Sequence, residues 1–163
     1  MKKILTQSQS LSIPVLSSLT QIYKLIEQNK NQIYVRSSKT VVGDLETGFS
    51  TNWANGSHEN GLSFISVSKQ GDDELLEHLE YIAWRLSIYY TPKGGYMIWL
   101  ATGEKAGRGS DEEPLLQNVV PLGIVSRELS LAMNAIFETL NTNIERQTPQ
   151  QKAEVENLLK KYK

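Results

Sequence analysis

The chain has 163 residues, of which 39% are hydrophobic and 21% charged, which is typical of a globular protein long enough to bury a core. It contains no cysteine, and this excludes disulfides, thiolate metal sites and a cysteine nucleophile. The net charge of −1 predicts no general attraction to nucleic acid or acidic membranes, and no segment reaches the roughly 18 apolar residues of a membrane span, so we expect a soluble, cytoplasmic protein.

The first third of the chain predicts one helix and one strand before a long loop. Residues 1–16, with Pro14 and several serines, are expected to be irregular. Ser17 or Ser18 can cap a helix that reaches about Asn29, since its apolar side chains recur at helical spacing. A short strand is predicted at 32–36. Residues 37–61 are rich in glycine and polar side chains, and so long a loop in a compact domain is often functional.

The middle of the chain predicts a strand at 62–68 and then a long amphipathic helix over 71–90, opened by acidic residues. Strands at 96–101 and 115–125 flank a glycine-rich, charged loop at 103–114. Pro121 predicts a bulge or a sheet edge in the second of these strands.

Two further helices are predicted at the end of the chain. Ser126 can cap a helix that reaches about Leu140. Thr148 at the cap, Pro149 at the first helical position and Gln151 two residues later are typical of a helix start, and they predict a last helix to Tyr162. The narrow apolar side of this last helix could dock on the domain or serve as an oligomer contact.

These elements predict an α+β fold, with a small, mostly antiparallel sheet of four strands covered by helices. We expect an irregular N-terminal segment at 1–16, a single α+β domain at 17–145 and a C-terminal helix at 146–163.

Arg36 ends a predicted strand and is followed by two serines. An arginine in this position can clamp a phosphate or a carboxylate with two parallel hydrogen bonds. The alternative is a structural one, in which Arg36 pairs with Asp44 or Asp111 and pins the loop.

A second candidate site lies in the long loop, where Ser50, Asn52 and Trp53 follow one another closely. Small hydroxyl and amide side chains beside an aromatic ring could bind a flat ligand and hydrogen-bond its edge. The same residue types are also typical of tight turns, and both interpretations stay open.

The charged loop at 103–114 supplies Arg108, Asp111 and Glu113 as candidate site residues. Glu113 shares its side of the pleat with the apolar Leu115, so it would enter a partly buried environment and have either a raised pKa or a cationic partner such as Arg36 or Arg108. A functional carboxylate and a structural ion pair are therefore the two interpretations of Glu113.

Other chemistry finds little support in the sequence. His58 and His78 are far apart and each is expected at the surface, and no metal-ligand spacing is present, so no metal is predicted. The loop at 103–114 lacks the lysine and the following helix of a phosphate-binding loop.

Two resemblances follow from these motifs. Residues 32–125 resemble a bacterial family of unknown function through Tyr-Val-Arg-Ser at 34–37, Gly-Phe-Ser at 48–50 and Thr-Gly at 102–103 with Gly-Arg-Gly at 107–109. The order Arg36, Ser50 and Glu113 is also similar to that of the site residues of ADP-ribosyltransferases. This second resemblance implies NAD as cofactor, with Arg36 holding a phosphate or ribose and Ser50 supporting the site. It also implies that Glu113 is the catalytic carboxylate, which positions the ribose hydroxyl.

The sequence therefore predicts a soluble binding or interaction module for a small molecule or a protein, with its polar site built from the loops at 37–61 and 103–114. The alternative is an ADP-ribosyltransferase-like enzyme that uses NAD. A third interpretation is that both loops only lock the fold.

Overall fold

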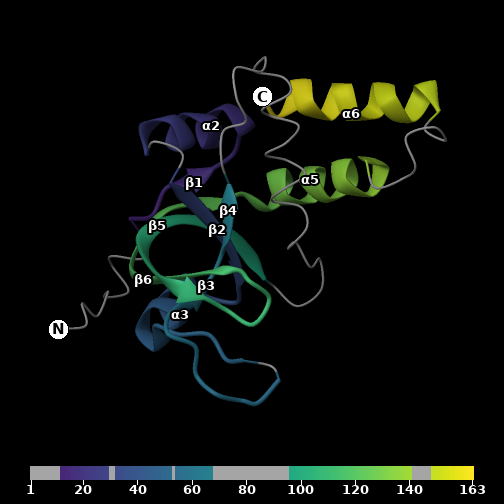
Figure 1. Cartoon of the computed structure of the whole chain (residues 1–163). Coiled ribbons are helices and arrows are strands. Elements are labelled where there is room, and N and C mark those ends of the chain that lie inside the picture. Colours follow the sequence, from purple (N-terminus) through teal and green to yellow (C-terminus); the bar gives the residue numbers. More distant parts are fainter. Residues whose placement is uncertain (1–11, 30–31, 53, 68–95, 141–147) are drawn as a thin grey trace.

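The computed structural model describes residues 12–29, 32–52, 54–67, 96–140 and 148–163 (Figure 1). The helix predicted at 71–90, with His78, and the candidate residue Trp53 lie outside the described residues. The elements along the chain are β1 (Val15–Leu16), α2 (Leu19–Gln28), β2 (Ile33–Ser38), α3 (Val41–Thr47), β3 (Leu62–Ser63), β4 (Ile65–Val67), β5 (Met97–Arg108), β6 (Pro114–Val125), α5 (Arg127–Leu140) and α6 (Pro149–Lys161).

The strands form one 6-stranded mixed sheet in the order β1-β6-β5-β2-β4, with β3 paired to β6. The predicted α+β class is confirmed. The sheet is mixed instead of mostly antiparallel, because β1 adds a parallel pair to β6 while the other pairs run antiparallel. β1 lies inside the segment expected to be irregular, and its two residues are too few to show a strand pattern.

The sheet curls on itself because residues 62–67 pair with two strands, β6 and β2, that are not neighbours in the sheet. β3 pairs with β6, whereas β4, directly after it, pairs with β2 (Figure 1). The register between β5 and β6 also shifts at three places, and an extra residue in one strand of a pair bends that strand and increases its twist. Pro121 pairs with Ala101 directly beside the first shift, as predicted for a bulge.

The curled sheet has a different apolar cluster on each face. The outer cluster packs against α2, α5 and α6, and its members on these helices are Leu19, Ile22, Ile26, Leu129, Met133, Val155 and Leu159. The inner cluster contains Tyr34, Val41, Leu62, Phe64, Trp99, Ala101 and Leu116, with Leu45 of α3 packed against it. Figure 1 shows α3 on the opposite side of the sheet from these three helices.

The predicted helix ends are confirmed in α2 and α6. Ser18 and Thr148 each form a capping box with the glutamine at the third helical position, Gln21 and Gln151 respectively. Helix α6 docks on the outer cluster. The Leu19 amide of α2 donates a 2.7 Å hydrogen bond to the carbonyl of Tyr162, the residue that caps the C-terminal end of α6. Among the described residues, no helix is long and apolar enough to cross a membrane.

Candidate functional site

Most of the segment at 103–114, predicted as a loop, is β-strand. β5 continues to Arg108 and β6 begins at Pro114, which leaves a short turn at 109–113. Two backbone hydrogen bonds close this turn, from the Gly109 amide to the Glu113 carbonyl (2.8 Å) and from the Glu112 amide to the Gly109 carbonyl (3.1 Å). The strand prediction failed for the end of β5 because residues 103–108 are rich in glycine and charge, so no alternation of apolar and polar side chains marks them.

A bulge at Gly107 places two cationic side chains in one site. Lys105 pairs with Leu116 and Arg108 with Pro114, so β5 holds one residue more than β6 between these pairs. In a regular strand, residues three positions apart point to opposite faces. The bulge, which includes Gly107 at φ 113°, removes this offset, and the side chains of Lys105 and Arg108 line the same hollow.

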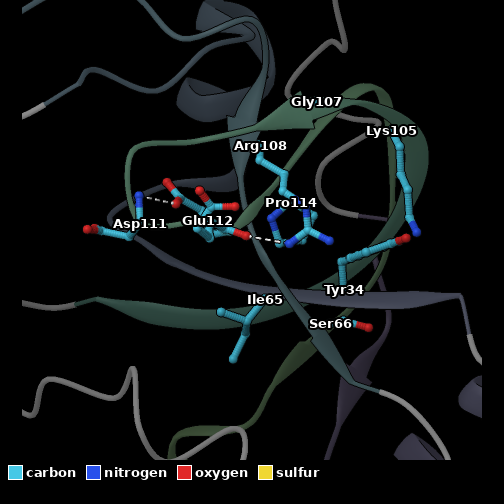
Figure 2. Close-up of a pocket in the computed structure, with 10 residues that line it drawn as sticks. Tyr34, Ile65, Ser66, Lys105, Gly107, Arg108, Asp111, Glu112 and Pro114 are labelled. Atoms are coloured by element: carbon cyan, nitrogen blue, oxygen red, sulfur yellow. Dashed lines mark hydrogen bonds between the residues drawn. The ribbon is translucent and has the colours of Figure 1, made fainter.

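The hollow lies between the β5–β6 hairpin and strands β2 and β4, and its volume is about 390 Å³ (Figure 2). This volume is within the range of small-molecule sites. Its lining comes from Tyr34, Ile65 and Ser66 on the sheet and from Lys105, Gly107, Arg108, Asp111, Glu112, Glu113 and Pro114 on the hairpin.

Three hydrogen-bond donors meet at one end of the hollow. Tyr34 is only 5% exposed, and its ring packs edge-on against Phe64 at 6.5 Å. Its hydroxyl makes no hydrogen bond within the described residues. The Arg108 Nη1 donates to the Glu112 carbonyl (2.9 Å), which leaves the other nitrogens of its guanidinium for a ligand. Figure 2 shows Tyr34 and Lys105 at the same end of the hollow, with Arg108 directed into it.

Glu113 is bound by neutral donors and by neither of its predicted arginine partners. Its carboxylate accepts hydrogen bonds from the Ser63 hydroxyl (3.0 Å) and from the Asp111 amide (2.9 Å). It also lies where a side chain at Gly109 would start, since a Cβ there would overlap its oxygens. Glu113 therefore fixes the hairpin turn, and it is also one of the residues that line the hollow.

Arg36 hydrogen-bonds to three other residues of the protein and does not line the hollow. Its Nε pairs with Asp44 at 2.6 Å, one of the two partners named by the structural alternative. Its Nη1 donates to the Ser50 hydroxyl (3.1 Å) and to the Ser63 carbonyl (2.7 Å). Since the Arg36 and Asp44 side chains are about one-fifth exposed (20% and 22%), this pair is largely shielded from solvent.

Ser63 connects these contacts of Arg36 to the hairpin. Its amide donates to the Ser50 hydroxyl (2.9 Å), its carbonyl accepts from Arg36 and its own hydroxyl donates to Glu113. The network connects Arg36, Ser50 and Glu113 through hydrogen bonds between protein groups. Ser63 itself was not predicted, since a serine in a strand carries no local signal for such a role.

The same network continues into the inner cluster. Asp44 also accepts a hydrogen bond from the Ser38 hydroxyl, whose oxygen accepts from the indole nitrogen of Trp99 (2.8 Å). Trp99 and Ser38 are both buried. The position of the hairpin is therefore linked through side chains to the centre of the fold.

Residues 37–61, predicted as one long loop, contain helix α3. Thr40 caps this helix through its side chain, and Gly48 ends it in the left-handed conformation (φ 78°). Asn52 lies in a tight turn beyond it, where its side chain accepts from the Ala54 amide (2.9 Å). The side chain of Asn52 thus takes part in a turn, which is one of the two alternatives considered for it, and the residue does not line the hollow.

Of the predicted site residues, Arg108, Asp111 and Glu113 line the hollow, whereas Arg36 and Ser50 lie in the network beside it. The sequence did not single out Tyr34 or Lys105 for the site. The signal for Lys105 was its place in the charged segment, whereas Tyr34 looked like any aromatic residue of a strand.

Comparison with known proteins identifies a family but no activity. Residues 9–151 match the family described as "Family of unknown function (DUF6098)". No curated protein and no solved structure matches the chain.

Proposed function

The chain belongs to this family of unknown function, and from its site geometry we propose that it is a cytoplasmic binding module for a small polar ligand. The ligand binds in the hollow between the β5–β6 hairpin and strands β2 and β4. Of the two segments predicted to build the polar site, 37–61 and 103–114, the proposed binding site uses only the second, together with residues of β2 and β4.

One observation supports this proposal above the others: the bulge at Gly107 turns Lys105 and Arg108 into the same hollow, beside the hydroxyl of the buried Tyr34. Preformed sites with a few convergent polar groups are typical of ligand binding.

The proposal is tested by screening the full chain against small anionic, cationic and dipolar compounds, with binding followed by backbone NMR. A ligand of the hollow should shift resonances of residues 105–113, and Arg108→Gln should abolish these shifts. The matched control is Arg127→Gln, since Arg127 is exposed at the start of α5. Shifts confined to other parts of the chain, or shifts that survive Arg108→Gln, would contradict the proposal.

The ADP-ribosyltransferase-like alternative is favoured by one observation, namely that Arg36, Ser50 and Glu113 lie in one hydrogen-bond network. It ranks second because Arg36 and Ser50 do not line the hollow, and their side chains hydrogen-bond to protein groups in the network beside it.

NAD binding separates the two functions. If the chain is an enzyme of this kind, NAD should raise its melting temperature, and Glu113→Gln should change that shift. A melting temperature that does not respond to NAD would remove the enzyme alternative and leave the binding module.

A further inference from the structure

We infer that the group bound between Lys105, Arg108 and Tyr34 is a single carboxylate, contributed by a small organic acid or by the C-terminus of a peptide. This inference rests on the proposed function and names the chemistry of the ligand.

The donors at this end of the hollow fit an anion. The guanidinium of Arg108 uses Nη1 for the Glu112 carbonyl (2.9 Å) and keeps Nε and Nη2 for a second partner. An arginine offers a carboxylate two parallel N–H donors, and Lys105 adds a mobile charge that needs no fixed geometry. The Tyr34 hydroxyl supplies a third donor on a ring that packing against Phe64 holds in place.

The acidic side chains around the hollow disfavour anions that carry several charges. Two basic and three acidic side chains line it, so acidic groups exceed basic groups by one. Asp111, Glu112 and Glu113 all lie on the hairpin turn that borders the cationic end. These carboxylates would repel a phosphate or pyrophosphate. The single negative charge of a carboxylate can instead be balanced by the positive charges of Lys105 and Arg108.

Figure 2 shows one of these acidic side chains turned away from the cationic end. The Asp111 side chain is directed away from the Arg108 guanidinium, and the cationic end of the hollow is flanked by Tyr34 and Lys105. A carboxylate can therefore approach Arg108 without passing between it and Asp111. The whole hollow, of about 390 Å³, accommodates a small acid or the last residues of a peptide.

The test compares three sets of probes on the full chain by NMR titration at constant ionic strength. The first set contains small monocarboxylic acids and free amino acids, and the second contains short peptides with a free C-terminus, each matched to its C-terminal amide. The third contains inorganic phosphate and pyrophosphate. We expect carboxylates to shift the Arg108 side-chain signal and peptide amides to fail. Small acids that bind as tightly as peptides identify a small acid as the ligand, and selective binding of free C-termini identifies a peptide.

Variants assign the binding to the inferred groups. Arg108→Gln and Lys105→Met should each weaken carboxylate binding by at least about tenfold, because each removes a charge-assisted hydrogen bond. Arg127→Gln and Lys152→Met carry the same changes on exposed helix positions and should leave binding unchanged.

Two outcomes would overturn the inference, and they are distinguishable. Phosphate or pyrophosphate, or a cationic compound, binding the hollow more tightly than every carboxylate would overturn the carboxylate and leave the binding module standing. If no compound of any charge perturbs residues 105–113, the inference and the proposed function both fail.

Discussion

The Ser63 hydroxyl donates a 3.0 Å hydrogen bond to the Glu113 carboxylate, across 50 positions of the sequence. This contact joins strand β3 to the hairpin that carries the cationic side chains. Its strength and its effect on the hairpin are open to measurement.

Replacing Ser63 by alanine should lower the free energy of unfolding by about 1 kcal/mol, the usual net value of one hydrogen bond. Glu113 would keep its bond from the Asp111 amide, so the turn should stay formed but detach from the sheet. Urea unfolding measures the first effect, and faster amide hydrogen exchange at 109–113 measures the second. Ser110→Ala, at a serine of the same turn, is the control. Equal behaviour of the two variants would show that the Ser63 contact does not hold the hairpin.

The ion pair between Arg36 and Asp44 should show strong coupling in a double-mutant cycle. Arg36→Met removes three hydrogen bonds and leaves the Asp44 carboxylate, about one-fifth exposed (22%), without its cation. We expect a coupling energy of about 1–3 kcal/mol between Arg36→Met and Asp44→Asn, measured by chemical unfolding. The cycle of Arg127→Met with Asp44→Asn should be additive. A coupling as small as that of this control would assign no structural role to the pair.

A side chain at Gly109 should displace Glu113 from its hydrogen bonds. A Cβ at Gly109 would overlap the end of the flexible Glu113 side chain, which would move and lose its bonds from Ser63 and Asp111, so Gly109→Ala should destabilise the protein by about 1–2 kcal/mol. In the background of Glu113→Ala the same change should cost less than about 0.5 kcal/mol, because the overlapping group is gone. Thermal unfolding of the four proteins measures both values. An equal cost in the two backgrounds would attribute the effect to the backbone of Gly109 instead of to Glu113.

Local capping signals allowed the starts of α2 and α6 to be predicted, whereas helix α3 was missed although Thr40 and Gly48 bound it. Elements that depend on distant contacts were missed as well. Ser18 and Thr148 carry their capping partners within three residues, so both helix starts could be predicted. The parallel strand at 15–16 depends on its pairing with Ile124 and Val125. The residues next to it in the sequence carry no signal of this pairing.

The candidate site shows the same limit. Arg36 and Asp44 are 8 positions apart, and their pairing was one of the alternatives considered. The role of Ser63 depends on Glu113, 50 positions away, and the shared face of Lys105 and Arg108 depends on a bulge that only the pairing with β6 creates. A register shift leaves almost no trace in the sequence except a glycine, and glycines have many other uses.

Tyr34 separates ligand binding from stability more cleanly than any other residue of the hollow. Tyr34→Phe removes the hydroxyl and keeps the ring that packs at 6.5 Å from Phe64 in the inner cluster. The free energy of unfolding should therefore change by less than about 0.5 kcal/mol. The affinity for a carboxylate should fall about tenfold, since a hydrogen bond to a charged group is lost. Chemical unfolding and NMR titration measure the two quantities.

The control for this prediction is Tyr162→Phe, which removes a hydroxyl at the end of α6, outside the lining of the hollow. It should leave the affinity unchanged. If Tyr34→Phe lowers stability and affinity together, the hydroxyl acts through the fold. If it changes neither, the hydroxyl takes no part in binding, and the anion must be held by Lys105 and Arg108 alone.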